Sequence, residues 1–304
     1  MQGVPVLGGK RPKRALVGDC RKTMPRSRLR RASLQRGNRS IHQTNGRSLM
    51  DISTAREKIV SFIRDYVEGN CGGVIVGLSG GLDSAVTAAL CAEAIGIEAV
   101  DLIALPYRTS APSSLADAQR IAEHLAGELE VMDISAPVDA MVNLAGGTDK
   151  LRLGNIAARM RMIILYDISA VRGKLVAGTG NRTERHLGYS TLWGDMACAF
   201  TPIGGLLKTQ ERLLAREIGL PEWVIEKTPT ADLWQGQTDE GEMGITYKTA
   251  DEIIFAIHDE AISREELIAR GISQKDIDLV LERERKYEFK RRMPAYPELP
   301  GLPL

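Results

Sequence analysis

The chain has 304 residues, 43% of them hydrophobic, and a formal net charge of +1, which is enough apolar sequence for one large folded domain and excludes a wholly disordered protein. It contains no apolar run of about 18 residues, so we expect no membrane span. The four cysteines form no C-x-x-C pair, so neither a disulfide framework nor a zinc site is indicated. A reducing, cytoplasmic location is expected.

The charge is distributed unevenly along the chain. Residues 1–47 hold 13 of the 40 Lys and Arg residues and a single acidic residue, Asp19. Residues 1–48 are rich in Arg, Gly and Ser, a composition that predicts a disordered, basic leader. Three interpretations of this leader stay open. It resembles an organellar transit peptide, or it contacts nucleic acid or acidic partners. Alternatively, translation begins at Met50 and the leader is a mis-assigned start. We expect residues 49–304 to form a single domain and do not expect nucleic acid to be its partner.

The folded part is predicted to begin with a helix. Thr54 and Glu57 form a capping box, and an apolar stripe follows from Ile59 to Val67. This stripe is interpreted either as ordinary core packing or as a contribution to a subunit interface.

Strands and helices then alternate along the chain. Strands are predicted over residues 74–78, 99–105, 129–134 and 174–179. Helices are predicted over residues 84–95, 115–125, 154–171, 206–218, 247–256, 264–269 and 274–290, with a polar loop over 228–240. The alternation predicts an α/β fold, a doubly wound, Rossmann-like parallel sheet with helices on both faces. Its ligands are expected at the carboxyl ends of the strands.

The loop after the first strand carries the strongest functional signal. It reads Gly77-Leu78-Ser79-Gly80-Gly81-Leu82-Asp83-Ser84. A strand-loop-helix junction gathers backbone N–H groups and the positive end of a helix dipole, and both favour phosphate. The glycines allow close approach, and the serines add hydroxyl donors. Asp83 would repel a phosphate unless a divalent cation lay between them, so the loop also predicts magnesium.

A second set of polar residues follows the strand at 174–179. Thr179 and Glu184 should lie at the carboxyl end of that strand, beside the glycine-rich loop if the sheet is doubly wound. The glycine-rich loop at residues 77–84 is neither a Walker A loop nor a dinucleotide fingerprint.

The Ser-Gly-Gly-Leu-Asp-Ser loop resembles the pyrophosphate loop of the N-type ATP pyrophosphatases, whose fold is the adenine nucleotide alpha hydrolase-like fold. Further segments, in order, are similar to the ammonia-dependent NAD synthetases. They are Ala158-Arg159-Met160-Arg161-Met162, Gly178-Thr179-Gly180-Asn181-Arg182-Thr183-Glu184, Thr201-Pro202-Ile203 with Lys208, Pro229-Thr230-Ala231-Asp232-Leu233, Gly236-Gln237-Thr238-Asp239-Glu240, Gly244-Ile245-Thr246-Tyr247 and Lys290-Arg291-Arg292. The resemblance extends from about residue 51 to residue 297.

This resemblance implies a ligase that amidates deamido-NAD with ammonia at the expense of ATP, through an acyl-adenylate, giving NAD, AMP and pyrophosphate. It implies catalytic roles for Asp83, Lys208 and Thr230, and magnesium at Asp83 and Glu184. ATP contacts are implied for Gly77, Leu78, Ser79, Gly80, Gly81, Leu82, Asp83, Ser84, Thr179, Lys208 and Thr230. Contacts with deamido-NAD are implied for Arg159, Asp195, Phe289 and Lys290.

The family resemblance also implies a homodimer. Because this length leaves no room for a glutamine-hydrolysing domain, the nitrogen is expected to come from free ammonia or from a partner chain.

Three positions depart from the family pattern, and all lie on the side of the dinucleotide. Leu192 stands where the family usually has Lys, Ala199 where it has Asp, and Phe289 where it often has His. The sequence therefore leaves two alternatives open. One is a related ligase that amidates a different carboxylate, and the other is a nucleotide-binding module without catalysis.

Overall fold

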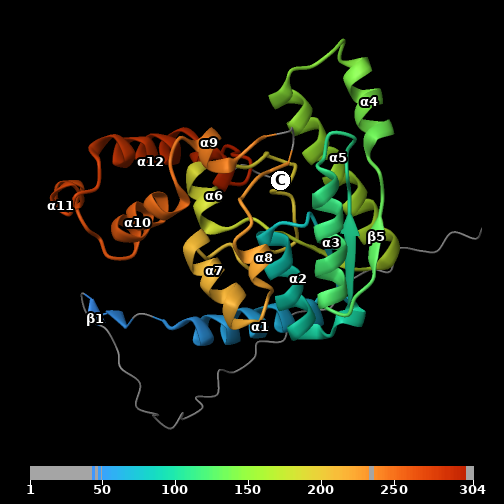
Figure 1. Ribbon diagram of the computed structural model, residues 1–304, viewed down its shortest axis with the longest axis horizontal. Helices are drawn as coiled ribbons and strands as arrows, with labels where there is room; N and C mark the ends of the chain where they lie inside the picture. The colour runs from blue at the N-terminus through green and yellow to red at the C-terminus, as the bar shows by residue number, and fades with distance from the viewer. Residues whose placement is uncertain (1–42, 45–46, 49, 233–235, 299–304) are drawn as a thin grey trace, which may run out of the picture. The chain divides into compact units, whose positions relative to one another are not determined.

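The computed structural model describes residues 43–44, 47–48, 50–232 and 236–298 (Figure 1). The leader prediction for residues 1–42 lies outside these residues, as do Leu233 and Trp234 of the polar loop. Two short strands, β1 (Gln43–Thr44) and β2 (Arg47–Ser48), form an antiparallel pair. The prediction of no regular structure up to residue 48 is therefore wrong for these four residues.

A four-stranded parallel sheet forms the centre of the fold. Its strands are β3 (Val74–Gly77), β4 (Val100–Ala104), β5 (Leu129–Val131) and β6 (Leu175–Ala177), in the order β5-β4-β3-β6. Val74 of β3 pairs with Val100 on one side and Leu175 on the other. The chain thus crosses to the far side of β3 after β5, so the topological switch point lies between β3 and β6. The predicted parallel sheet is confirmed.

Helices cover both faces of the sheet, as predicted (Figure 1). Side chains of β3 alternate between two cores. Val74 and Val76 pack into the core that contains α1 (Ile52–Glu68), α2 (Leu82–Ile95), α3 (Pro112–His124), α7 (Lys208–Glu217) and α8 (Glu222–Ile225). Ile75 packs into the opposite core, with α4 (Ser135–Leu144) and α5 (Lys150–Arg172). Helix α4 was not predicted, because its apolar residues show little helical periodicity. A short turn, η1 (Ile97–Ala99), precedes β4.

Helix α1 starts earlier than the sequence suggested. Its N-cap is Asp51, whose carboxylate accepts a hydrogen bond from Thr54 N at 2.7 Å. The predicted capping box at Thr54 is therefore wrong, since Thr54 already lies inside the helix. Ile63 and Val67 are buried against the sheet core. These two residues of the stripe follow the core-packing interpretation, whereas Phe62 of the same stripe is 44% exposed.

The C-terminal helices enclose a third core. This cluster comprises α6 (Arg182–Leu187), α9 (Asp239–Met243), α10 (Tyr247–His258), α11 (Arg264–Ala269), α12 (Gln274–Lys286) and the short turn η2 (Glu288–Arg291). The predicted last helix is four residues too long, because the chain tightens into η2 after Tyr287. Leu187 at the end of α6 is fully buried in this cluster. Helix α6 therefore joins the sheet edge to the C-terminal helices.

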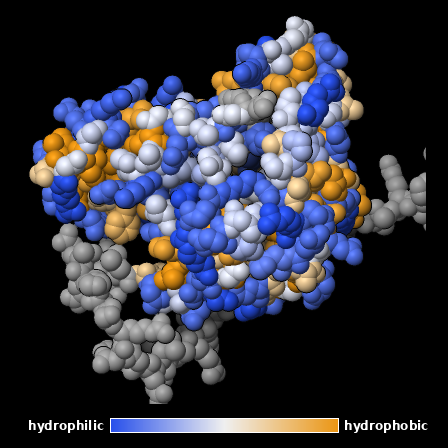
Figure 2. All heavy atoms as spheres, in the orientation of Figure 1, coloured by the Kyte–Doolittle hydropathy of each residue, from blue (hydrophilic) through white to orange (hydrophobic). Residues whose placement is uncertain are grey.

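Figure 2 shows a largely hydrophilic surface on this face, with hydrophobic side chains gathered mainly at its flanks. Within the described part of the chain, no helix combines the length and apolar character that crossing a membrane requires.

Candidate active site

A cavity of about 730 Å³ lies at the carboxyl edge of the sheet, where the fold class predicts ligands. Its walls come from the loop after β3, the end of β6, helix α6 and the start of α7. Twelve of the predicted site residues line it, namely Gly77, Leu78, Ser79, Gly81, Leu82, Asp83, Thr179, Glu184, Asp195, Lys208, Thr230 and Lys290. Four do not, namely Gly80, Ser84, Arg159 and Phe289.

The glycine-rich loop has a shape that its sequence requires. Strand β3 ends where Leu78 N donates to Ile103 O at 2.8 Å. Gly80 then adopts φ +79°, and a Cβ at this position would lie 2.2 Å from Ser114 O. Only glycine fits, because it is both free at positive φ and without a side chain.

Ser84 shapes the loop from within. Its hydroxyl donates to Gly81 O at 3.0 Å and accepts from Ser79 N at 3.2 Å, and the residue is 2% exposed. Helix α2 begins at Leu82 with Gly81 as its N-cap, two residues before the predicted start. Asp83 lies in the first turn and its carboxylate is directed to partners from other helices.

Asp83 connects three separate parts of the chain. One carboxylate oxygen accepts from Asn181 Nδ2 at 2.7 Å, and the other is paired with Lys208 Nζ. Burial raises the pKa of Asp83, but the Lys208 ammonium outweighs it and holds the pKa below the usual value. The Lys208 side chain is 1% exposed, and although burial lowers its pKa, the surrounding carboxylates raise it above the ordinary value. A charged lysine is thus held at the floor of the cavity.

Glu184 lies on the inner face of α6. Its Oε2 accepts from Asn181 N at 3.2 Å while the Asn181 side chain caps Glu184 N at 3.0 Å. Burial and the negative charge of Asp83 raise the pKa of Glu184 well above its usual range. Two carboxylates that repel each other in this way form an oxygen donor set that a divalent cation would relieve, so the residues fit magnesium.

Glu211 is a site residue that the sequence analysis missed. Its side chain is 0% exposed, and Oε2 lies 3.2 Å from Lys208 Nζ. Within the described residues, neither carboxylate oxygen of Glu211 accepts a hydrogen bond of normal geometry. Burial, followed by the Asp83 charge, raises the pKa of Glu211 well above its usual value. A signal was present, because Glu211 follows Lys208 by three positions on a predicted helix and so shares its face.

Two further polar residues close the cavity and carried no individual sequence signal. Lys227 Nζ donates to Gly80 O at 2.8 Å and to Asp117 Oδ2 at 2.7 Å, which supports the glycine-rich loop from outside. Asp232, at φ +49°, accepts from Ala111 N at 3.0 and 3.1 Å. That contact ties the segment containing Thr230 to the start of α3.

The other end of the cavity is built differently. Lys290 Nζ donates to Gly188 O at 2.8 Å and Ser190 O at 2.6 Å, and burial lowers its pKa. Arg159 Nη2 donates to Leu192 O at 3.2 Å, so its guanidinium holds the loop beside Leu192 and does not line the cavity. Phe289 is 57% exposed and also lies outside the lining. Backbone carbonyls thus accept the hydrogen bonds of both Lys290 and Arg159 at this end.

The fold and this cavity belong to a known class of enzyme. Comparison with solved structures places the chain in the Rossmann-like fold of the N-type ATP pyrophosphatases. The sequence model for NAD synthase matches residues 55–294. The chain therefore belongs to the NAD synthase family, and its enzyme class is that of ligases that form C–N bonds.

Relatives of known sequence are similar over most of their length. The NH(3)-dependent NAD(+) synthetase of Trichlorobacter lovleyi is 43% identical over 257 residues, which cover 84% of this chain and 94% of the relative. That of Chlorobium phaeobacteroides (strain DSM 266) is 44% identical over 233 residues, covering 75% and 84%.

Two solved structures share the fold over their full length. The NH3-dependent NAD synthetase of Campylobacter jejuni aligns with a TM-score of 0.70 at 35% identity, covering 82% of this chain and 100% of that one. The NMN synthetase of Francisella tularensis aligns with a TM-score of 0.73 at 28% identity and the same coverage.

Proposed function

We propose that the chain amidates deamido-NAD with ammonia, using ATP, through an acyl-adenylate, and releases NAD, AMP and pyrophosphate. The observation that carries this proposal is the buried Lys208–Asp83 pair beneath the glycine-rich loop, in a chain of the NAD synthase family. This arrangement supplies positive charge and hydrogen-bond donors where a pyrophosphate would leave. A retained, charged lysine also argues against a module without catalysis.

The reaction needs two displacements. The nicotinate carboxylate attacks the α-phosphorus of ATP, and the bond from that phosphorus to the bridging oxygen breaks, which frees pyrophosphate. Ammonia then attacks the acyl carbon, the C–O bond to AMP breaks, and the nitrogen loses a proton. No covalent bond to the enzyme is required, so positioning and electrostatic stabilisation carry the catalysis.

The residues of the cavity have distinct tasks in this scheme. The loop amides and the Ser79 hydroxyl would hold the leaving pyrophosphate, with Thr179 and Thr230 in contact with ATP. Lys208 would exchange its contact with Asp83 for the phosphate oxygens. Asp83 and Glu184 would hold Mg²⁺, which when bound neutralises charge on the pyrophosphate.

The acceptor site is the part of the proposal that most needs testing. Asp195 and Lys290 line the cavity, so they are proposed to contact deamido-NAD, whereas Arg159 and Phe289 would have to reach it from outside the lining. One structural relative is named an NMN synthetase. Together with Leu192, Ala199 and Phe289, this favours nicotinate mononucleotide as the alternative carboxylate.

Ammonia is proposed as the nitrogen source because NH3-dependent relatives align over almost their whole length. By contrast, the glutamine-dependent NAD+ synthetase of Acinetobacter baumannii is covered over 48% of its chain. A homodimer is proposed as well, since Ile163 and Val171 of α5 are 53% and 80% exposed and offer an apolar contact. The proposed location is the cytoplasm.

The test uses the full chain with ATP, Mg²⁺, ammonium and either deamido-NAD or nicotinate mononucleotide. NAD and pyrophosphate forming in equal amounts with deamido-NAD would support the proposal. Amidation of the mononucleotide alone would replace the acceptor while leaving the ATP chemistry intact. Binding of ATP with no pyrophosphate from either acid would contradict the proposal.

A further inference from the structure

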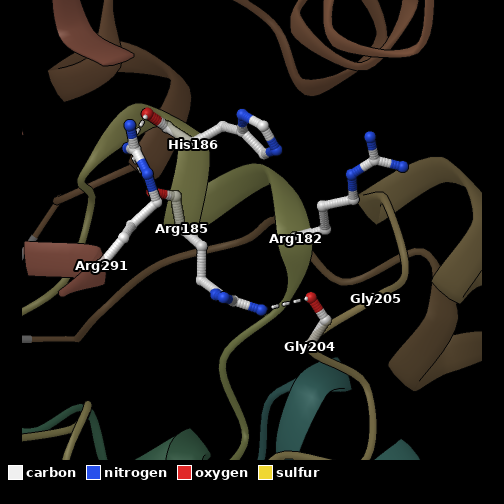
Figure 3. A pocket seen from close by; sticks show the side chains of 6 residues that line it. All are labelled: Arg182, Arg185, His186, Gly204, Gly205 and Arg291. Carbon is white, nitrogen blue, oxygen red and sulfur yellow. Dashed lines mark hydrogen bonds between the residues drawn. The ribbon is translucent and has the colours of Figure 1, made fainter. Parts of the chain in front are cut away.

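A second hollow lies on the outer side of α6, away from the active-site cavity. Its volume is about 280 Å³, and its lining consists of Arg182, Arg185, His186, Gly204, Gly205 and Arg291 (Figure 3). None of these residues lines the cavity described above. The ATP chemistry therefore gives no reason for three arginines to surround this hollow.

Two of the arginines are held in place by neutral partners. Arg185 Nη1 donates to Gly204 O at 3.0 Å. Arg291 Nη1 donates to Arg185 O at 3.1 Å and His186 O at 3.2 Å (Figure 3). Its Nη2 donates to Glu284 O at 2.8 Å. Carbonyl groups fix the orientation of a guanidinium without cancelling its charge. Each guanidinium has five N–H donors, so both retain donors for a ligand.

The carboxylates closest to the hollow already have other partners. Asp259 pairs with Arg182, with N–O distances of 2.7 and 3.1 Å. The Glu284 carboxylate accepts from His186 Nδ1 at 2.5 Å and His258 Nε2 at 2.9 Å. Within the described residues, Arg185 and Arg291 have no carboxylate partner. In this part of the chain, neither of these two guanidinium groups therefore has a direct ion-pair partner, and the Glu284 carboxylate contacts only histidines.

A cation is the weaker candidate for this region. The ligand atoms of His186, His258 and Glu284 lie within 4.8 Å of one another, close enough to hold a metal ion. However, the guanidinium groups of Arg185 and Arg291 would repel a divalent cation. The same two charges would attract an anion.

We propose that this hollow binds a phosphate-class anion, as inorganic phosphate, pyrophosphate or the phosphate of a nucleotide. Two guanidinium groups without an ion-pair partner among the described residues favour an anion, and the planar fork of arginine matches the geometry of phosphate oxygens. The volume of the hollow is large enough for inorganic phosphate or pyrophosphate together with some water. The proposal does not depend on the proposed acceptor, because binding is measured without turnover.

The position of the hollow links this site to the reaction. Arg182, Arg185 and His186 lie on the outer side of α6, whereas Glu184 of the same helix lines the active-site cavity. An anion held on the outer side would restrain the helix that carries Glu184. Phosphate-class products and substrates bound in the hollow would then affect the position of Glu184 in the active-site cavity.

The test measures the binding of inorganic phosphate, pyrophosphate and AMP by calorimetry to the full chain. A saturating ATP analogue that cannot be cleaved occupies the glycine-rich loop, so that only the second site is observed. We expect one anion to bind to the wild type and Arg185→Gln to weaken it about tenfold, because one charge-assisted contact is lost. Circular dichroism should show Arg185→Gln to be folded, since Arg185 is exposed.

The matched control is Arg216→Gln, because Arg216 is paired with Glu222 and Glu226 and should not contribute to anion binding. Equal weakening of all three anions in Arg185→Gln would show that a single phosphate group is recognised, and weakening of pyrophosphate alone would make the diphosphate the ligand. No binding to the wild type, or the same affinity in Arg185→Gln and Arg216→Gln, would overturn the proposal. Loss of NAD formation with anion binding preserved would affect only the proposed function.

Discussion

The two ends of the active-site cavity are built from different materials. At the end proposed for ATP, side chains from α2, α6 and α7 contact one another directly, and Lys208 and Glu211 are buried. At the end proposed for the dinucleotide, Lys290 and Arg159 are held by backbone carbonyls on more open loops. A side-chain network of buried charges tolerates few substitutions, because each loss leaves another charge unpaired. Of the three departures from the family pattern, Leu192 accepts the contact of Arg159 at the other end and Phe289 precedes Lys290, whereas Ala199 packs against the sheet core.

The largest expected effect tests the end of the cavity proposed for ATP, called the closed end here because its charged side chains are buried. Asp83→Asn keeps the shape of the side chain but removes a carboxylate that pairs with Lys208 and is proposed to hold Mg²⁺. We expect the rate of pyrophosphate release to fall by about 10²–10³-fold, as for the loss of one electrostatic element of an active site.

The control for this variant is Asp101→Asn. Asp101 is also ion-paired, with Lys174 at 2.8 Å and Arg172 at 3.1 Å, but it lies on β4 toward the opposite edge of the sheet. Its variant should release pyrophosphate at the wild-type rate. Equal rates in the wild type and Asp83→Asn would show that the closed end is not where ATP is cleaved.

The next effect concerns the backbone of the loop. Gly80→Ala should destabilise the fold by roughly 1–3 kcal/mol and weaken ATP binding, because the new Cβ would meet Ser114 O and the positive φ is strained. Thermal unfolding and ATP titration measure both effects. Gly72→Ala is the matched control, since a Cβ there meets nothing within 4 Å. Similar stability in the two variants would contradict the described loop geometry.

The buried carboxylates also predict how stability depends on pH. The folded-state pKa values of Glu184 and Glu211 are raised, so the stability linked to their protonated forms is present below the unfolded value of about 4.3 and is lost as pH rises through the raised values. The pKa of Asp83 is lowered, so its contribution is present above about 3.9 and is lost as pH falls through its folded value.

Protein without Mg²⁺ should therefore become less stable from weakly acidic to alkaline pH. Glu211→Gln removes one of the two groups responsible, so urea unfolding over the same pH range should show a shallower decline. The difference should be about 1.4 kcal/mol for each unit by which the pKa of Glu211 is raised. An identical slope in wild type and variant would show that Glu211 is ionised in the folded protein at neutral pH.

The smallest effect is expected at the end proposed for the dinucleotide, the open end of the cavity. Leu192→Lys restores the residue type that the family usually has, and a partly exposed charge contributes about 0.2–1 kcal/mol. The KM for deamido-NAD should fall by no more than about fivefold, while the KM for ATP stays unchanged. Steady-state kinetics with each substrate varied in turn measure the split. A change in the KM for ATP alone would show that the two ends are not separable.

Some of this architecture could be predicted from local sequence. The alternation of strands and helices predicted the parallel sheet, and the spacing of the glycines predicted the tight loop after β3 that lines the cavity. The proximity of Glu184 to Asp83 also followed, because parallel strands bring their carboxyl ends to one edge of the sheet. Each of these inferences depends on periodicity or on a topological rule, which a single sequence reveals.

Other features depend on contacts between segments far apart in the chain. The burial of Glu211, the support of Gly80 by Lys227 and the anchoring of Asp232 at Ala111 were not predicted. The sequence by itself determined which residues form the strands and the loop, because side-chain periodicity and the steric limits of the backbone act locally. Only the tertiary structure decided which charges are buried and paired, because desolvation and Coulomb interactions depend on neighbours that packing brings together.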